Sequence, residues 1–209
     1  MQISDGCFNM KKLFQYSPPY FAVGIGLFGF RSGWLAILLY HAGMITFLAL
    51  DRNRPPFRTI LQGWHRTWAW LIPFCATGGV AIYLLWPWMQ QQADLNALLS
   101  DYGLTGWKWT AFLFYYSIIH PPLEQYYWRG YLGNDSKRLR IEDAGFSGYH
   151  FMTMICFVQW PWALLTFFIL TGVAWLWRQS VRETRGLRIA VLTHLIADIS
   201  VIWMVNALL

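Results

Sequence analysis

The segment "WTAFLFYYSIIHPPLEQYYWRG", Trp109 to Gly130, decides the fold of this chain. Its first half is a run of apolar and aromatic residues, which predicts a helix inside a lipid bilayer. Its second half places two prolines, a glutamate, a glutamine and an arginine within ten residues. A charged side chain near the bilayer centre costs about 2.5–3.5 kcal/mol. Glu124 therefore requires a partner, access to water or a function that offsets this cost.

The composition of the whole chain indicates a membrane protein. Of its 209 residues, 56% are hydrophobic, 19% are aromatic and only 12% are charged, whereas a soluble domain averages about 25% charged residues. The net charge of +6 comes from basic residues dispersed between apolar runs, which favours membrane-protein loops over a nucleic-acid partner. Cys7, Cys75 and Cys156 form no C-x-x-C pair, which disfavours disulfides and zinc–cysteine sites.

The apolar runs predict an all-α transmembrane bundle of about seven helices, because one span needs about 20 apolar residues. We expect a single domain, residues 1–209, with N-terminal helices in 1–106 and the motif-bearing helices in 107–209. A short interfacial helix is expected in the polar connection before the fourth span. The predicted spans are Pro19–Phe30, Gly33–Leu50, Thr67–Met89, Trp107–Tyr131, Phe146–Trp160, Pro161–Trp177 and Leu187–Leu209.

The distribution of charge predicts the orientation. Lys11 and Lys12 precede the first run, which has no clear cleavage site, so we expect a retained membrane segment rather than a signal peptide. With alternating spans, 14 of the 16 Lys and Arg residues fall on one side, and only Arg31 and Lys108 fall on the other. Because cytoplasmic loops carry the excess of basic residues, we predict a cytoplasmic N-terminus and an external C-terminus.

Four ionisable residues are expected at one depth of the bilayer. Glu124 lies near the cytoplasmic end of the fourth span, His150 in the first turns of the fifth, and His194 and Asp198 in the first half of the seventh. His194 and Asp198 are spaced i,i+4 and share a helix face, so the carboxylate can fix the imidazole tautomer. We predict that these residues meet in a water-accessible cavity open toward the cytoplasm.

The residues around Glu124 suggest a broken helix. Pro121 and Pro122 remove two backbone donors and predict a kink or a restart. Gln125 and Arg129 are spaced i,i+4, so Arg129 is expected to face Gln125. Each ionisable residue also has a structural alternative, such as an ion pair of Glu124 with Arg129.

The remaining histidines, His41, His65 and His120, are assigned structural or interfacial roles. His120 is the exception to follow, because it precedes Glu124 by four residues. The aromatic residues are assigned no chemistry.

Three short motifs stand in order on the predicted membrane helices: "EQYYWR" (Glu124 to Arg129), "FSGYH" (Phe146 to His150) and "HLIAD" (His194 to Asp198). They resemble the motifs E-E-x-x-x-R, F-x-x-x-H and H-x-x-x-N of the CAAX-protease and bacteriocin-processing family of intramembrane proteases. That family includes the type II prenyl-protein endopeptidases. The resemblance covers the chain from Trp107 to its C-terminus.

The resemblance implies glutamate-based peptide hydrolysis in a multi-pass protein of a bacterial plasma membrane. Glu124 is the implied general base, His150 shares that role, and His194 stabilises the oxyanion, with Asp198 as its partner. The implied supporting residues are Gln125, Arg129 and Phe146. No metal and no cofactor are expected. The implied substrate is a membrane-associated protein or peptide, cleaved near its C-terminus or leader.

Two positions depart from the family pattern: Gln125 stands where a second glutamate is usual, and Asp198 stands where asparagine is usual. We expect Asp198 to orient His194 or to balance the charge of Arg129. Three other functions stay open. The chain could be a zinc metalloprotease using Glu124, His150 and His194, perhaps with His120. It could be a non-catalytic immunity or partner-binding protein of the same family. It could be a proton-coupled transporter.

Overall fold

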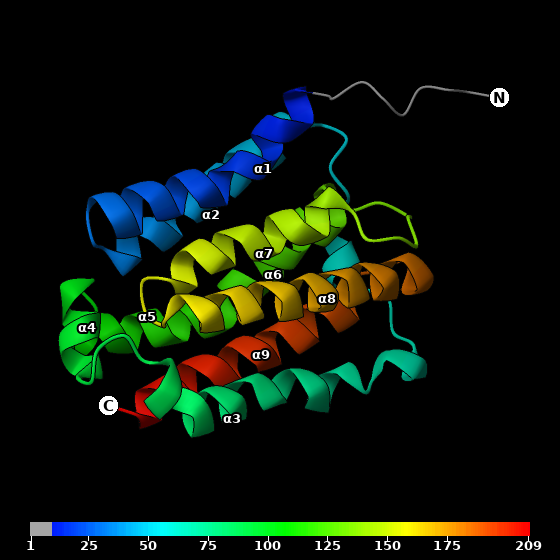
Figure 1. Ribbon diagram of the computed structural model, residues 1–209. Coiled ribbons are helices and arrows are strands. Elements are labelled where there is room, and N and C mark those ends of the chain that lie inside the picture. The colour runs from blue at the N-terminus through cyan, green and yellow to red at the C-terminus, as the bar shows by residue number, and fades with distance from the viewer. Residues whose placement is uncertain (1–9) are drawn as a thin grey trace.

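The computed structural model describes residues 10–209, with side chains from Phe14 onward. Cys7 and the side chains of Lys11 and Lys12 lie outside the described residues. The described chain is all helical, which confirms the predicted class (Figure 1). Its α-helices are α1 (Met10–Val23), α2 (Gly33–Leu50), α3 (Leu71–Met89), α4 (Leu95–Asp101), α5 (Gly106–Ile118), α6 (His120–Gln125), α7 (Ile141–Met154), α8 (Trp160–Thr184) and α9 (Arg188–Ala207). Two π-helices, η1 (Gly24–Gly29) and η4 (Tyr126–Tyr131), and two 3₁₀ segments, η2 (Phe57–Leu61) and η3 (Arg66–Trp68), complete it.

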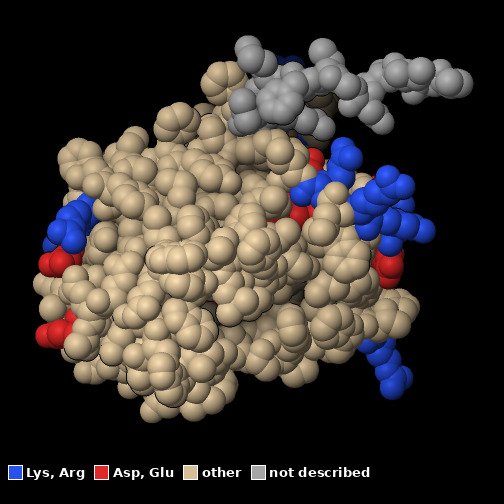
Figure 2. All heavy atoms as spheres, viewed as in Figure 1, with Lys and Arg blue, Asp and Glu red and all other residues tan. Residues whose placement is uncertain are grey.

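Four described helical segments are long and apolar enough to cross a membrane: Gly33–Leu50, Arg66–Met89, Trp160–Thr184 and Arg188–Ala207. Figure 2 shows the charged side chains gathered at two opposite ends of the molecule, with a broad uncharged surface between them. Uncharged surface between charged ends suits a bundle that is immersed in a bilayer. The sequence therefore correctly indicated an integral membrane protein.

The described residues form nine α-helices rather than about seven, for two reasons. The predicted span Trp107–Tyr131 is divided into α5, α6 and η4, and the expected interfacial helix is present as α4. The span Gly33–Leu50 coincides with α2. The fifth span begins earlier than predicted, because α7 starts at Ile141.

The first two helical runs form a hairpin. Ser32 caps α2 by accepting a hydrogen bond from the backbone N–H of Leu35 at 3.2 Å. Arg31 adopts a left-handed conformation, φ 48°, which reverses the chain direction. Pro18 and Pro19 lie inside α1, which starts at Met10, ahead of the predicted start of the first span at Pro19.

The break in the fourth span follows from Pro121 and Pro122. Both stand in the first turn of α6, where the missing backbone donors have no intrahelical partner to lose. Downstream, η4 has the wider turn of a π-helix, so residues four apart no longer share a face as they do in an α-helix. The two irregularities turn Glu124 and Gln125 inward, where both are fully buried.

Close packing of α3 on α9 fixes the position of the third motif. A Cβ atom at Gly79 would collide with the backbone carbonyl of Ser200 on α9. The N–H of Gly79 instead donates to Ser200 Oγ at 3.3 Å. Small residues allow membrane helices to approach in this way, and α3 lies beside α9 in Figure 1.

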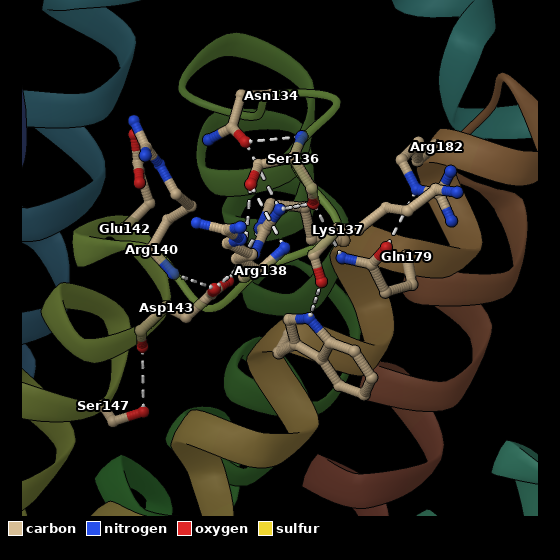
Figure 3. A network of polar contacts seen from close by, with 12 residues as sticks. Asn134, Ser136, Lys137, Arg138, Arg140, Glu142, Asp143, Ser147, Gln179 and Arg182 are labelled. Carbon is tan, nitrogen blue, oxygen red and sulfur yellow. Dashed lines mark hydrogen bonds and ion pairs between the residues drawn. The ribbon is translucent and has the colours of Figure 1, made fainter. Parts of the chain in front are cut away.

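A buried ion pair anchors α7, the helix of the second motif (Figure 3). Asp143, in the first turn of α7, receives Arg178 Nε at 3.0 Å and Nη2 at 2.6 Å from α8. The same carboxylate caps α7 by accepting the N–H of Arg140 at 3.0 Å. Arg178 also donates to the carbonyls of Ser136 and Arg138 in the preceding loop. This network holds the loop, α7 and α8 together.

Candidate active site

Glu124 is the centre of a buried polar cluster. Its side chain has 0% exposure. Oε1 accepts hydrogen bonds from the hydroxyl of Tyr40 on α2, at 2.6 Å, and from the hydroxyl of Tyr149 on α7. Hydrogen bonds to the ionised form stabilise a carboxylate that burial would otherwise destabilise. The two tyrosine hydroxyls thus offset part of the free-energy cost of burying the Glu124 carboxylate.

The other oxygen of Glu124 faces two histidines. Glu124 Oε2 lies 3.3 Å from His120 Nε2 and 3.5 Å from His194 Nε2. Asp198 Oδ1 lies 3.3 Å from the same His194 nitrogen. The predicted meeting of Glu124, His194 and Asp198 is therefore present, and His120 joins them from the first turn of α6.

His150 reaches the cluster through its neighbour. The hydroxyl of Tyr149 lies 3.2 Å from His150 Nε2, while it also contacts Glu124. His150 Nδ1 lies 2.9 Å from the carbonyl oxygen of Phe146, which can only accept, so Nδ1 carries a proton. The Nε2 atom is then free to exchange a proton with the hydroxyl. His150 lies in the last turns of α7, not in the first turns of its helix as predicted.

The supporting residues divide into those that the structure brings to the cluster and one that it does not. Gln125 Nε2 lies 2.9 Å from His194 Nδ1. Phe146 is fully buried, and its ring centroid lies 4.5 Å from that of His150. Arg129 does not face Gln125: its guanidinium carbon lies 4.0 Å above the Phe146 ring. The π-helix η4 removes the α-helical spacing on which the predicted Gln125–Arg129 contact depended.

Three residues that contact the cluster were not predicted as site residues from the sequence: Tyr40, Tyr149 and His41. His41 Nε2 lies 3.0 Å from His120 Nδ1, and His41 Nδ1 lies 2.6 Å from the hydroxyl of Tyr115. The adjacent Tyr–His pairs, Tyr40-His41 and Tyr149-His150, are a sequence signal that could have drawn attention to these residues. The contact of His41 with His120 agrees with the structural role that the sequence assigned to His41.

An apolar cavity of about 200 Å³ adjoins the cluster. His120, Tyr149 and His150 line its inner end, while residues such as Leu99 and Phe157 line the part near α4. The cavity thus extends toward the end of the bundle opposite the arginine-rich loops. The predicted opening toward the cytoplasm stays a prediction. Much of the lining comes from α2, α4 and α5, to which no site residue was assigned.

Among the described residues, one group could hold a metal ion: His120, His194 and Asp198, whose ligand atoms lie within 4.8 Å of one another. The zinc set considered from the sequence differs, because it contained His150. His150 Nδ1 is bonded to a backbone carbonyl, and its Nε2 atom contacts Tyr149.

Comparison with known proteins identifies the segment that carries the cluster. Residues 106–200 match the family model described as type II CAAX prenyl endopeptidase Rce1-like. No curated protein and no solved structure matched the chain significantly. The matched range contains all three motifs and confirms the resemblance that they carry. Residues 106–200 of this integral membrane protein, which carry Glu124, His150, His194 and Asp198, are thus similar to the type II CAAX prenyl endopeptidase Rce1-like family.

Proposed function

We propose that the chain is an intramembrane endopeptidase in which Glu124 and His150 together activate the hydrolytic water. The observation that carries this proposal is the hydroxyl of Tyr149, which contacts both Glu124 Oε1 and His150 Nε2. Both groups therefore lie within hydrogen-bond reach of one atom, as a shared base requires. His150 also lines a largely apolar cavity, together with Tyr149 and His120, which contact Glu124.

The proposed reaction uses the cluster in two steps. Glu124 takes a proton from water while the water oxygen attacks the carbonyl carbon of the scissile peptide bond. His194, presenting Nε2, stabilises the oxyanion of the tetrahedral intermediate, for which one such donor is worth about 2.7–4 kcal/mol. The intermediate then collapses, the C–N bond breaks, and the proton passes to the leaving amine through Glu124 or His150.

Asp198 and Gln125 act on His194 rather than on the substrate. They contact opposite nitrogens of its ring: Gln125 at Nδ1 and Asp198 at Nε2. Of the two roles considered for Asp198, the partner of His194 is supported over the counter-charge of Arg129, because Arg129 packs on Phe146.

The lining of the cavity supports a substrate with an apolar segment beside its scissile bond. A membrane-associated peptide with a C-terminal lipid fits this description, and a prenylated C-terminal peptide is what the matched family's description names. A cleavable leader peptide with an apolar stretch is the second substrate class.

The test uses the full chain reconstituted in lipid vesicles, with a fluorogenic farnesylated C-terminal peptide as substrate. Glu124→Gln keeps the shape and hydrogen bonding of the side chain but cannot take a proton, so cleavage should be abolished. His150→Ala should be comparably damaging, because residues that act as a unit have non-additive effects. His65→Ala, at an exposed histidine outside the cluster, is the control. Cleavage by Glu124→Gln at the wild-type rate would end the assignment of hydrolysis to this cluster.

A further inference from the structure

Atoms that can each donate a lone pair to a metal ion converge beside Glu124. Three separations are known: 3.3 Å from Glu124 Oε2 to His120 Nε2, 3.5 Å from the same oxygen to His194 Nε2, and 3.3 Å from His194 Nε2 to Asp198 Oδ1. Two ligands that each lie 2.0–2.1 Å from a tetrahedral zinc ion are about 3.3–3.4 Å apart. The separation of His194 Nε2 from Asp198 Oδ1 is therefore that of two zinc ligands, and the ligand atoms of His120, His194 and Asp198 all lie within 4.8 Å of one another.

The contacts within the cluster leave one carboxylate oxygen without a partner. Glu124 Oε2 faces the Nε2 atoms of His120 and His194, but no hydrogen bond from any described residue reaches Asp198 Oδ2. Asp198 is buried, and a buried charged oxygen without a partner is strongly destabilising. Among the described residues, no Lys or Arg forms an ion pair with Glu124 or Asp198. A divalent cation bound by Asp198 would satisfy its free oxygen and offset the charge of the two carboxylates.

Each imidazole has a partner on its other nitrogen, as ligating histidines almost always do. His120 can donate Nδ1–H to His41 Nε2 at 3.0 Å, and His41 can donate its own Nδ1–H to Tyr115 at 2.6 Å. The lone pair of His120 Nε2 then faces the cluster. For His194, a half-turn of the Gln125 amide brings Oε1, which has no hydrogen-bond partner among the described residues, to Nδ1–H. His194 Nε2 is then free in the same way.

We propose that this chain binds one zinc-class divalent cation through His120 Nε2, His194 Nε2 and a carboxylate oxygen of Asp198, with Glu124 beside the ion. Two imidazoles and one carboxylate form a ligand set that leaves a fourth position for water. His120 lies outside the three motifs, and Asp198 replaces the asparagine that is usual at the end of the third motif. The expectation of no metal rested on the resemblance to a glutamate-based family and did not include His120, which the break at Pro121 brings to the cluster.

The consequence for catalysis rests on the proposed function. Glu124 would keep its role as base, while a bound ion would acidify the water and would stabilise the oxyanion in place of His194, whose Nε2 atom would then hold the ion. Binding itself is independent of that function, because it is measured without substrate.

The experiment measures zinc directly. The purified full chain in detergent is stripped with a chelator, loaded with Zn²⁺ and desalted, and its metal content is determined by mass spectrometry. We expect about one zinc ion per chain. Asp198→Asn and His120→Gln should each lose most of that zinc. His150→Gln is the matched control: it removes a cluster histidine outside the ligand set, and its zinc content should equal that of the wild type.

A further variant keeps the test informative if the ligand variants fail to fold. His41→Phe removes only the outer partner of His120, so zinc should still bind, with an affinity about 10–100-fold lower in chelator competition. Wild-type protein without zinc after loading would overturn the proposal. Full zinc content in Asp198→Asn and His120→Gln would also overturn it. A zinc-free chain whose cleavage depends on Glu124 would refute the metal site alone, whereas a zinc-loaded chain that cleaves no substrate would refute the proposed function alone.

Discussion

Replacing Tyr149 by phenylalanine tests whether Glu124 and His150 act together. The variant removes one hydroxyl and keeps the ring, whose centroid lies 4.1 Å from that of His150. It deletes a hydrogen bond to a carboxylate, which is worth about 1.5–3 kcal/mol. If that bond is needed in the transition state, kcat should fall roughly 10–150-fold, because each 1.36 kcal/mol is a factor of ten in rate.

The matched control is Tyr40→Phe. Tyr40 donates to the same oxygen of Glu124 at 2.6 Å, but its hydroxyl is not bonded to His150. We therefore expect a smaller loss of activity from Tyr40→Phe than from Tyr149→Phe. The assay is single-turnover cleavage of the farnesylated peptide in vesicles, so that product release does not mask the chemical step. Wild-type kinetics in Tyr149→Phe, or equal losses in the two variants, would refute the bridging role of Tyr149.

Three further predictions follow from the surroundings of the site. Arg178→Met leaves Asp143 buried and without its ion-pair partner, so the free energy of unfolding should fall by about 3–5 kcal/mol. The control is Arg185→Met, which breaks an exposed ion pair with Asp135 and should cost no more than about 1 kcal/mol. Thermal unfolding in detergent compares the two variants. Ile37→Trp fills the cavity and should raise KM for the lipidated peptide, while Ile45→Trp, at an exposed position of the same helix, should leave KM unchanged. Gly79→Leu should lower the melting temperature, since overpacking costs about 1–3 kcal/mol, and Gly172→Leu, where a Cβ atom meets nothing, is its control.

The sequence was sufficient for the fold class because the bilayer imposes a simple rule. A run such as Gly33–Leu50 must be helical to satisfy its backbone, and the described α2 has the same bounds. The depth of Glu124, His194 and Asp198 followed from alternating spans alone. Their convergence needed no knowledge of side-chain packing, because ionisable groups at one depth of a membrane have few alternatives to meeting one another.

The contacts that the first half of the chain makes with the site could not be predicted in the same way. Tyr40 and His41 are polar residues in an apolar helix, and nothing in their spacing indicates which neighbour they face. Their contacts with Glu124 and His120 depend on how α2 packs against α6. The direction of the cavity depends on the same packing. The wrong prediction for Arg129 has a different cause. A π-helix changes the direction in which side chains point, and the sequence carries no clear signal of it.

The two departures from the family pattern are coupled, because Gln125 and Asp198 contact opposite nitrogens of His194. A neutral imidazole carries one proton. When Nε2 carries it, Nδ1 must accept, and the amide nitrogen of Gln125 lies 2.9 Å from Nδ1 as that state requires. When Nε2 is needed as a lone pair for a cation, Nδ1–H needs an acceptor, which the amide oxygen provides. Glutamine thus supports both proton states, whereas an ionised glutamate supports only the second.

Gln125→Glu should therefore be tolerated for folding and should bind zinc more tightly than the wild type, by roughly tenfold, the lower end of outer-partner effects. Chelator competition at neutral pH measures this affinity, and Gln125→Met, which can neither donate nor accept strongly, is the control and should bind more weakly. Equal zinc affinities in the glutamate, glutamine and methionine forms would show that position 125 does not set the proton on His194. Tighter binding in the methionine form would contradict the coupling outright, because His194 would then ligate best with no partner on its other nitrogen.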